Sequence, residues 1–152
     1  MARIIDVEAF ALLDIERTHR GGSVNIALLE DNPPILDYLS TALEMLGHTV
    51  YKFSSSAPLL ESLFIDESVR LPLPYDLALI DLLLPGSVSG LQTAQRIQQA
   101  IPSQQLHIIV LSACSQRELE EAQTALPQVP ILRKPFKIHE LAQLIDQMQP
   151  AG

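Results

Sequence analysis

The sequence is poor in cysteine, in basic residues and in long apolar runs. Cys114 is the one cysteine among 152 residues, so the chain can form neither an internal disulfide nor a cysteine-rich zinc site. The four histidines lie far apart in sequence and show no metal-ligand spacing. We expect each to be a surface or strand-end residue rather than a ligand. They are His19, His48, His107 and His139.

Charge and hydropathy exclude two further classes of protein. The 10 Lys and Arg residues are scattered and are outnumbered by 18 Asp and Glu residues, for a net charge of -8. A nucleic-acid surface needs clustered basic residues. No apolar run approaches the roughly 20 residues of a membrane span, and Asp6, Glu8 and Asp14 interrupt the N-terminal apolar stretch, unlike a signal peptide. We expect a cytoplasmic protein that binds neither nucleic acid nor membrane.

The apolar residues that are present predict a folded domain. They make up 47% of the chain, which excludes a disordered acidic protein and supplies one domain with a substantial core. Gly21-Gly22 forms a flexible joint after a short N-terminal segment. We therefore expect an extension over residues 1–22, a domain over 23–149 and a tail over 150–152. The extension is either an arm or helix packed on its own domain, or an amphipathic element for self-association or partner binding.

Short apolar runs alternate with helix-like stretches along the domain. This alternation predicts an α/β fold with a five-stranded parallel sheet and five helices on its two faces. The proline-rich stretch 71–74 must be a loop. The expected strands cover residues 24–31, 49–53, 75–81, 106–111 and 129–132. The expected helices run from about 34 to 47, over a segment containing Leu59, Leu60, Leu63 and Phe64, from about 91 to 100, from Ser112 or Ser115 to about 126, and from 138 to 148.

Polar residues follow four of the apolar runs directly. In a doubly wound sheet the carboxyl ends of the strands meet at one crevice, so these side chains should lie close together. Carboxylates, a hydroxyl and an ammonium group in one crevice indicate a site for phosphate and a divalent metal. The residues are Glu30 and Asp31, Asp81, Ser112, and Lys134 before Pro135.

The acidic residues can each be interpreted in two ways. A carboxylate at the end of a central strand, such as Asp81, can attack phosphorus, or it can cap the next turn. Glu30 and Asp31 would repel Asp81 unless a cation lay between them, and Mg²⁺ prefers such carboxylates. Alternatively, Asp31 caps the helix that begins near Pro34.

The hydroxyl and the ammonium group also have two interpretations each. Ser112 can donate to a phosphoryl oxygen or cap a helix. Lys134 can pair with Asp81 at rest and with a phosphoryl group afterwards, or it can be a solvated surface residue. The Lys134-Pro135 bond is a candidate for the cis form. The coincidence of these residues at successive strand ends favours the functional interpretation for all of them together.

Four motifs carry a resemblance to a known family. They are Leu-Leu-Glu30-Asp31-Asn, Leu-Ile-Asp81-Leu-Leu-Leu-Pro85-Gly, Val-Leu-Ser112-Ala and Leu-Arg-Lys134-Pro135-Phe136. From about Val24 to Met148 the chain resembles the receiver domain of two-component response regulators. The resemblance implies a flavodoxin-like, doubly wound fold with strand order 2-1-3-4-5.

The resemblance also implies a role for each site residue. Asp81 would accept a phosphoryl group from a histidine kinase or a histidine phosphotransfer protein in a phosphorelay. Lys134, Ser112 and the N–H of Ala113 would bind the phosphoryl oxygens. The ligands of Mg²⁺ would be Glu30, Asp31, Asp81 and the main-chain carbonyl of Leu83.

The chain differs from the usual pattern of this family in several features, among them a switch residue and the turn after Asp81. Ile131 stands three residues before Lys134, where family members usually carry Tyr or Phe as part of the switch that includes Ser112. The turn after Asp81 is one residue longer than the common version. Leu83 also argues against a competing function, an aspartate-dependent phosphatase. Such an enzyme would need an acid two residues after its nucleophile, and Leu83 occupies that position relative to Asp81.

We therefore expect a stand-alone signalling switch, a phosphoprotein that catalyses at most its own phosphorylation and dephosphorylation. Phosphorylation would alter a protein-binding surface made by the fourth helix, fifth strand and fifth helix, which contacts a protein target in trans. A homodimer is a further possibility. The alternative is a constitutive protein-binding scaffold of the same fold, and Ile131 is the residue that favours it.

Overall fold

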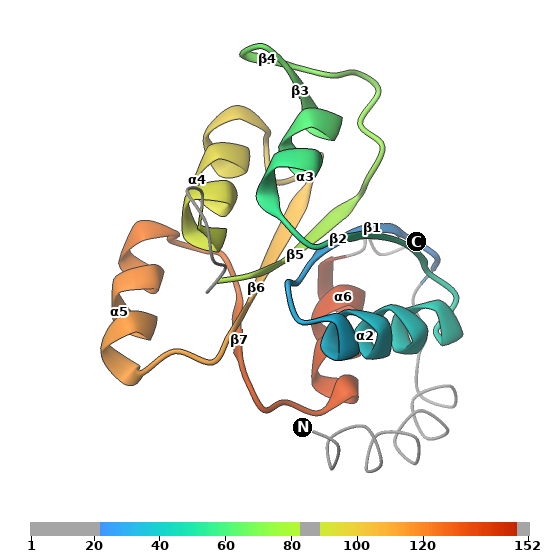
Figure 1. The fold of residues 1–152 in the computed structure, drawn as a ribbon, viewed down its shortest axis with the longest axis vertical. Helices are drawn as coiled ribbons and strands as arrows, with labels where there is room; N and C mark the ends of the chain where they lie inside the picture. The colour runs from blue at the N-terminus through green and yellow to red at the C-terminus, as the bar shows by residue number, and fades with distance from the viewer. Residues whose placement is uncertain (1–21, 83–88, 149–152) are drawn as a thin grey trace.

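A five-stranded parallel sheet with helices on both faces organises the protein (Figure 1). The structure is a computed structural model and describes residues 22–82 and 89–148. The strands are β1 (Asn25–Leu29), β2 (Thr49–Phe53), β5 (Leu77–Asp81), β6 (His107–Ser112) and β7 (Ile131–Arg133). The helices are α2 (Pro33–Met45), α3 (Ser56–Leu63), α4 (Gly90–Ala100), α5 (Gln116–Ala125) and α6 (Ile138–Met148).

The strands follow the order β2-β1-β5-β6-β7 across the sheet, and every neighbouring pair is parallel. Ranked along the chain, this order is 2-1-3-4-5. The predicted flavodoxin-like fold is therefore confirmed. The chain reverses its direction of winding between β1 and β5, which is where an open parallel sheet forms its crevice.

Two hydrophobic clusters, one on each face of the sheet, hold the helices in place. α2 and α6 cover one face, where Leu28 and Ile109 are fully buried. α3, α4 and α5 cover the other, where Leu29 and Ile80 are fully buried. Because successive strand residues point to opposite faces, the central strands must be apolar at every position. This explains the short continuous apolar runs of the sequence.

Side-chain caps fix where three helices begin. Asn32 caps α2 by accepting a hydrogen bond from the Ile35 amide at 3.2 Å. Ser89 opens α4 and Ser115 opens α5, each in a capping box with a Gln or Glu three residues later. The alternative that Asp31 caps α2 is therefore wrong, and so is the alternative that Ser112 caps α5. Both side chains lie outside the helices that they were candidates to begin.

A small antiparallel ribbon follows α3 and was not predicted. It consists of β3 (Phe64–Ile65) and β4 (Ser68–Val69). The helical assignment of Phe64 is wrong, because α3 ends at Leu63. The Phe64 ring packs against the Arg96 guanidinium, whose carbon lies 4.4 Å from the ring centroid. The periodicity of apolar residues within α3 does not reveal this tertiary contact with α4.

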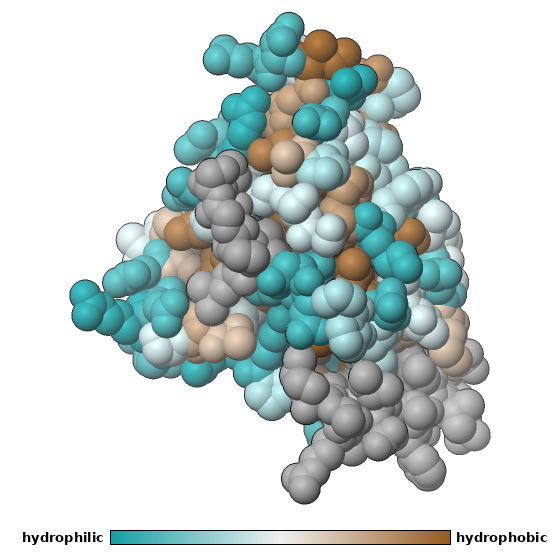
Figure 2. Space-filling view, viewed as in Figure 1, coloured by the Kyte–Doolittle hydropathy of each residue, from teal (hydrophilic) through white to brown (hydrophobic). Residues whose placement is uncertain are grey.

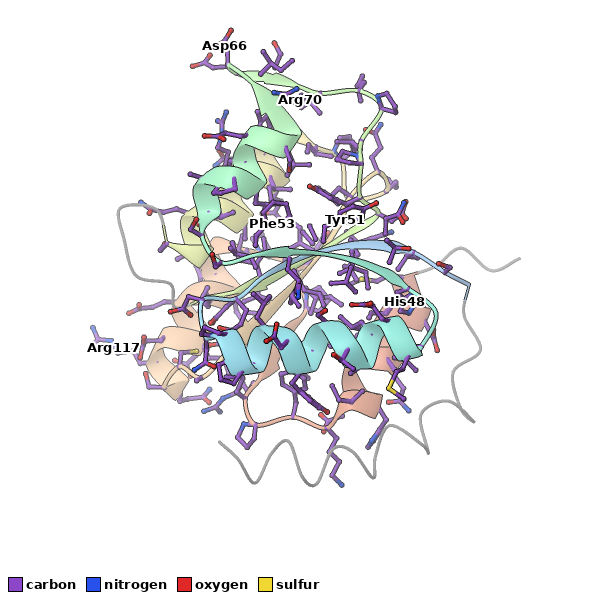
Figure 3. All side chains as sticks on the ribbon, turned by 45° about the vertical axis from the view of Figure 1, so that its right-hand side comes forward. His48, Tyr51, Phe53, Asp66, Arg70 and Arg117 are labelled. Atoms are coloured by element: carbon purple, nitrogen blue, oxygen red, sulfur yellow. The ribbon has the colours of Figure 1, made fainter. Side chains whose placement is uncertain are left out.

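The ribbon forms one end of the molecule and carries apolar surface (Figure 2). Its turn contains Asp66 in the left-handed region, with φ of 55°, a conformation that Asp tolerates better than most residues. Ile65 and Leu71 are exposed in this part of the chain. Asp66 and Arg70 lie far from α2 (Figure 3).

Strand ends differ from the expected ones by one or two residues. β1 ends at Leu29 rather than at Asp31, and β6 extends to Ser112. β7 begins at Ile131, because the preceding Pro130 has no N–H to donate and instead accepts a bond from the Val110 amide.

Within the described ranges, none of the helices has the length and apolar character that crossing a membrane requires.

Truncating the core should have a graded effect on stability. We expect Leu28→Ala to lower the free energy of unfolding by about 2–5 kcal/mol and Ile109→Val to lower it by about 0.5–1.5 kcal/mol. Both residues are fully buried, whereas Met45 is 41% exposed. Met45→Ala should therefore change stability by at most about 0.5 kcal/mol. Urea denaturation measures all three, and an equal loss in Leu28→Ala and Met45→Ala would contradict the described core.

Candidate functional site

The carboxyl ends of β1 and β5 bring three acidic residues together. Leu29 of β1 is paired with Ile80 of β5, so the next residues, Glu30 and Asp81, follow side by side. One carboxylate oxygen from each of Glu30, Asp31 and Asp81 can be chosen so that all lie within 4.8 Å of one another. Glu30 and Asp81 are buried, and Asp31 is more exposed. Such a cluster can hold a divalent cation.

Lys134 reaches this cluster from β7, the edge strand that lies two strands away from β5. It follows β7 directly, and its backbone N–H donates to the Ser112 carbonyl at 2.6 Å. Its ammonium lies 2.6 Å from Glu30 Oε1 and 3.4 Å from Asp81 Oδ2. The nearer partner is therefore Glu30, whereas the sequence pattern suggested Asp81. The peptide bond between Lys134 and Pro135 is cis.

The electrostatics of the cluster favour an additional cation. Burial raises the pKa of Glu30, a hydrogen bond with Asp81 raises it further, and the ammonium of Lys134 opposes both effects. Three carboxylates face one ammonium here, so negative charge remains uncompensated when all of them are ionised. A cation bound between the carboxylates would remove the repulsion that these groups experience.

Ser112 is the last residue of β6, which pairs with β5, the strand that ends at Asp81. It is fully buried, and its Oγ accepts a hydrogen bond from the Cys114 amide at 3.0 Å. The hydroxyl keeps its own O–H as a donor for a further acceptor. The next residue, Ala113, is exposed and begins the loop to α5. Cys114 is buried, as a small packing residue would be.

Of the other predicted site residues, Ile131 lies at the other end of β7 from Lys134, and Leu83 has no described position. Ile131 is half-buried and pairs with Val110 at the start of β7, three residues before Lys134. Leu83 lies outside the described residues, as do Pro85 and Gly86 of the turn after Asp81.

Asn32 and Gly90 shape the site and were not recognised in the sequence as site residues. The Asn32 amide donates to Glu30 Oε2 at 3.3 Å, so the residue that caps α2 also contacts the buried acid. A Cβ at Gly90 would clash with the backbone oxygen of Asp81. Only glycine allows α4 to begin this close to the acid. The sequence signals were an Asn before Pro33-Pro34 and a glycine at the start of a helix.

Adding a methyl group at Gly90 should distort the backbone next to Asp81. We expect Gly90→Ala to lower the free energy of unfolding by roughly 2 kcal/mol or more, as overpacking of a rigid backbone contact does. The Leu82 amide, which donates to the Leu111 carbonyl at 2.8 Å, should show a changed NMR chemical shift.

Gly47→Ala is the matched control for that substitution. Gly47 has φ of 95° and no atom within 4 Å of the added Cβ, so its cost comes from backbone strain alone. It should leave the Leu82 resonance in place. An unchanged Leu82 resonance in Gly90→Ala would show that the contact with Asp81 is not tight.

Comparison with solved structures identifies similar folds. The receiver domain of a sensor histidine kinase from Pseudomonas aeruginosa PAO1, solved with a magnesium ion coordinated in its active-site cleft, is 26% identical to this chain. The match covers 84% of this chain and 98% of that one, with a TM-score of 0.68. The response regulator protein TrrA from Thermotoga maritima, solved with Mg²⁺ and BeF, is 24% identical, and the match covers 82% of this chain and 98% of that one with a TM-score of 0.64.

A CheY-like response regulator receiver domain protein from Methanospirillum hungatei JF-1 shares the same fold. It is 21% identical, and the match covers 81% of this chain and 90% of that one, with a TM-score of 0.65. Residues 26–146 match the family described as the response regulator receiver domain. That match includes all five strands of the sheet and all five helices of the described structure, apart from the first residue of β1 and the last two residues of α6, and the chain therefore belongs to the response regulator receiver domain family.

Proposed function

We propose that this protein is a phosphorylation-dependent signalling switch in which Asp81 accepts a phosphoryl group. The donor is a phosphohistidine of a histidine kinase or of a histidine phosphotransfer protein. The observation that carries the proposal is the position of the Lys134 ammonium, which contacts both Glu30 and Asp81 at the carboxyl edge of the sheet. An ammonium beside a strand-end carboxylate can neutralise the charge that a phosphoryl group brings.

Mg²⁺ fits the acidic cluster as the second source of positive charge. Glu30, Asp31 and Asp81 supply carboxylate oxygens within 4.8 Å of one another, and hard cations of this kind prefer oxygen ligands. The Leu83 carbonyl is proposed as a further ligand. Bound there, the ion would offset charge on the phosphoryl oxygens. The magnesium in the Pseudomonas aeruginosa receiver domain and in TrrA supports the assignment.

The side chains divide the work of phosphoryl transfer. A carboxylate oxygen of Asp81 attacks phosphorus and forms the new O–P bond, while the N–P bond of phosphohistidine breaks and its electron pair stays on the imidazole nitrogen. Lys134 pairs with a phosphoryl oxygen once the group has arrived. Ser112 donates from its hydroxyl, and Ala113 donates from its backbone N–H. The protein is thus a phosphoacceptor rather than an enzyme that acts on a separate substrate.

The phosphoryl group would act at a distance through Ser112. Movement of Ser112 toward the phosphoryl group shifts the loop between β6 and α5, and the surface of α5, β7 and α6 then binds a cytoplasmic protein target in trans. Such a switch requires only that the partner contacts the two states differently.

A constitutive scaffold is the second candidate, and Ile131 favours it. This residue lies half-buried at the start of β7 and has no hydroxyl or ring with which to follow Ser112. A scaffold would bind its partner equally with and without a beryllofluoride adduct on Asp81, whereas a switch would bind the two forms with different affinities.

Exposure to a small phosphodonor with Mg²⁺ tests the proposed function. We expect the wild type to gain the mass of one phosphoryl group and Asp81→Asn to gain none, because an amide oxygen is a poor nucleophile toward phosphorus. Intact-mass spectrometry measures both proteins under the same conditions.

Asp37→Asn is the control for this labelling. Asp37 lies on α2 with its side chain 72% exposed and paired with Lys52, so it should label like the wild type. Equal labelling of wild type and Asp81→Asn, or no labelling of the wild type, would overturn the proposal.

Removing one acid from the cluster should separate metal binding from stability. We expect Asp31→Asn to weaken Mg²⁺ binding about tenfold or more, because one of the carboxylates is lost. Without Mg²⁺ the same variant should be more stable than the wild type, by up to about 1 kcal/mol, because a like charge is removed. Isothermal calorimetry and urea denaturation measure the two effects.

Asp66→Asn controls for the change in net charge. Asp66 lies on the β3–β4 ribbon, far from α2 (Figure 3), and Asn tolerates its positive φ of 55°. This variant should bind Mg²⁺ like the wild type. If it weakens binding as much as Asp31→Asn does, the metal does not depend on the acidic cluster.

A further inference from the structure

Arg133 and Lys134 are consecutive cations that serve different parts of the molecule. Lys134 reaches the acidic cluster. Arg133, the last residue of β7, instead contacts the chain between β6 and α5. Its Nη1 donates to Gln116 Oε1 and its Nη2 donates to the Cys114 carbonyl, each at 3.3 Å. One planar guanidinium therefore ties the loop and the first residue of α5 to the end of β7.

The arginine is connected to Ser112 through one residue. The Cys114 carbonyl accepts from Arg133, while the Cys114 amide donates to Ser112 Oγ at 3.0 Å. The Ser112 carbonyl in turn accepts from the Lys134 amide. These contacts close a hydrogen-bonded circuit from β7 through the loop and back to β7. A change at Arg133 is thereby transmitted to the hydroxyl that is buried beside the site.

We propose that Arg133 is a positioning residue that holds Cys114, and with it the Ser112 hydroxyl, in the arrangement in which Ser112 Oγ accepts from the Cys114 amide. The inference rests on the proposed function, in which Ser112 moves toward a phosphoryl group on Asp81. A contact made in one of two states favours that state by its own free energy. Arg133 therefore opposes phosphorylation. The equilibrium between the two positions of Ser112 depends on the strength of the hydrogen bonds from Arg133 to Cys114 and Gln116.

A charge-conserving substitution provides the test. Arg133→Lys keeps the positive charge near the site but replaces the two-pronged donor with an ammonium that cannot match both acceptors. We expect it to bind beryllofluoride, in the presence of Mg²⁺, about threefold to tenfold more tightly than the wild type, as the loss of one exposed and one partly buried hydrogen bond predicts. Its affinity for Mg²⁺ alone should stay unchanged.

Gln116→Ala removes one of the two acceptors without changing any charge. It should increase the affinity for beryllofluoride in the same direction, and its effect should not add to that of Arg133→Lys, because both act on one contact. Arg117→Lys is the matched control. Arg117 projects away from α5 (Figure 3) and pairs with Glu121, so its replacement should leave the affinity unchanged.

The outcomes distinguish the inference from the proposed function. If the wild type does not bind beryllofluoride, both are overturned. If the wild type binds and Arg133→Lys binds equally or more weakly, the inference alone is overturned. A parallel change in the affinity for Mg²⁺ alone would assign Arg133 a general structural role and would also contradict the inference.

Discussion

The ion pairs between Lys134 and the buried acids are the interaction on which the rest of the site depends. Burying a carboxylate costs several kcal/mol unless a partner compensates it, and this sheet buries both Glu30 and Asp81 at neighbouring strand ends. Lys134 compensates both from a strand that is not adjacent to either. The position of β7 in the sheet, and hence the order of all five strands, determines whether this compensation is available.

The same ion pairs bear on how the site would accept Mg²⁺ and a phosphoryl group in the proposed function. Lys134 makes its shorter contact with Glu30 and a longer one with Asp81. The ammonium is thus closer to Glu30 than to Asp81. Glu30 is also bound by the Asn32 amide, so its position is fixed from two sides. In the proposed function, Glu30 would stay in place as a metal ligand while Asp81 exchanges its contact with Lys134 for the phosphoryl group.

The features that were predictable from the sequence are those that depend on local patterns and on sheet topology. Continuous apolar runs identified the central strands because both faces of the sheet are covered, and the parallel order then required Glu30, Asp81 and Lys134 to meet. Geometry that depends on particular tertiary contacts was not predictable. Phe64 leaves the helical pattern where its ring packs on Arg96, and Gly90 is required only because α4 begins against the backbone of Asp81.

The proposed role of Arg133 also depends on tertiary contacts that the sequence did not predict. It offers a connection between β7 and the loop after β6 that does not require an aromatic residue at Ile131. A sequence of two basic residues before a proline does not reveal that one enters the acidic cluster while the other binds the loop after β6. Because the Cys114 carbonyl and the Gln116 side chain both accept from Arg133, β7 is mechanically connected to that loop at its carboxyl end. A link at this end of the strand does not need a hydroxyl or a ring at Ile131. In the proposed switch, Ser112 communicates with the α5 and β7 surface through the backbone of Cys114, and the aliphatic Ile131 serves to pack the start of the strand.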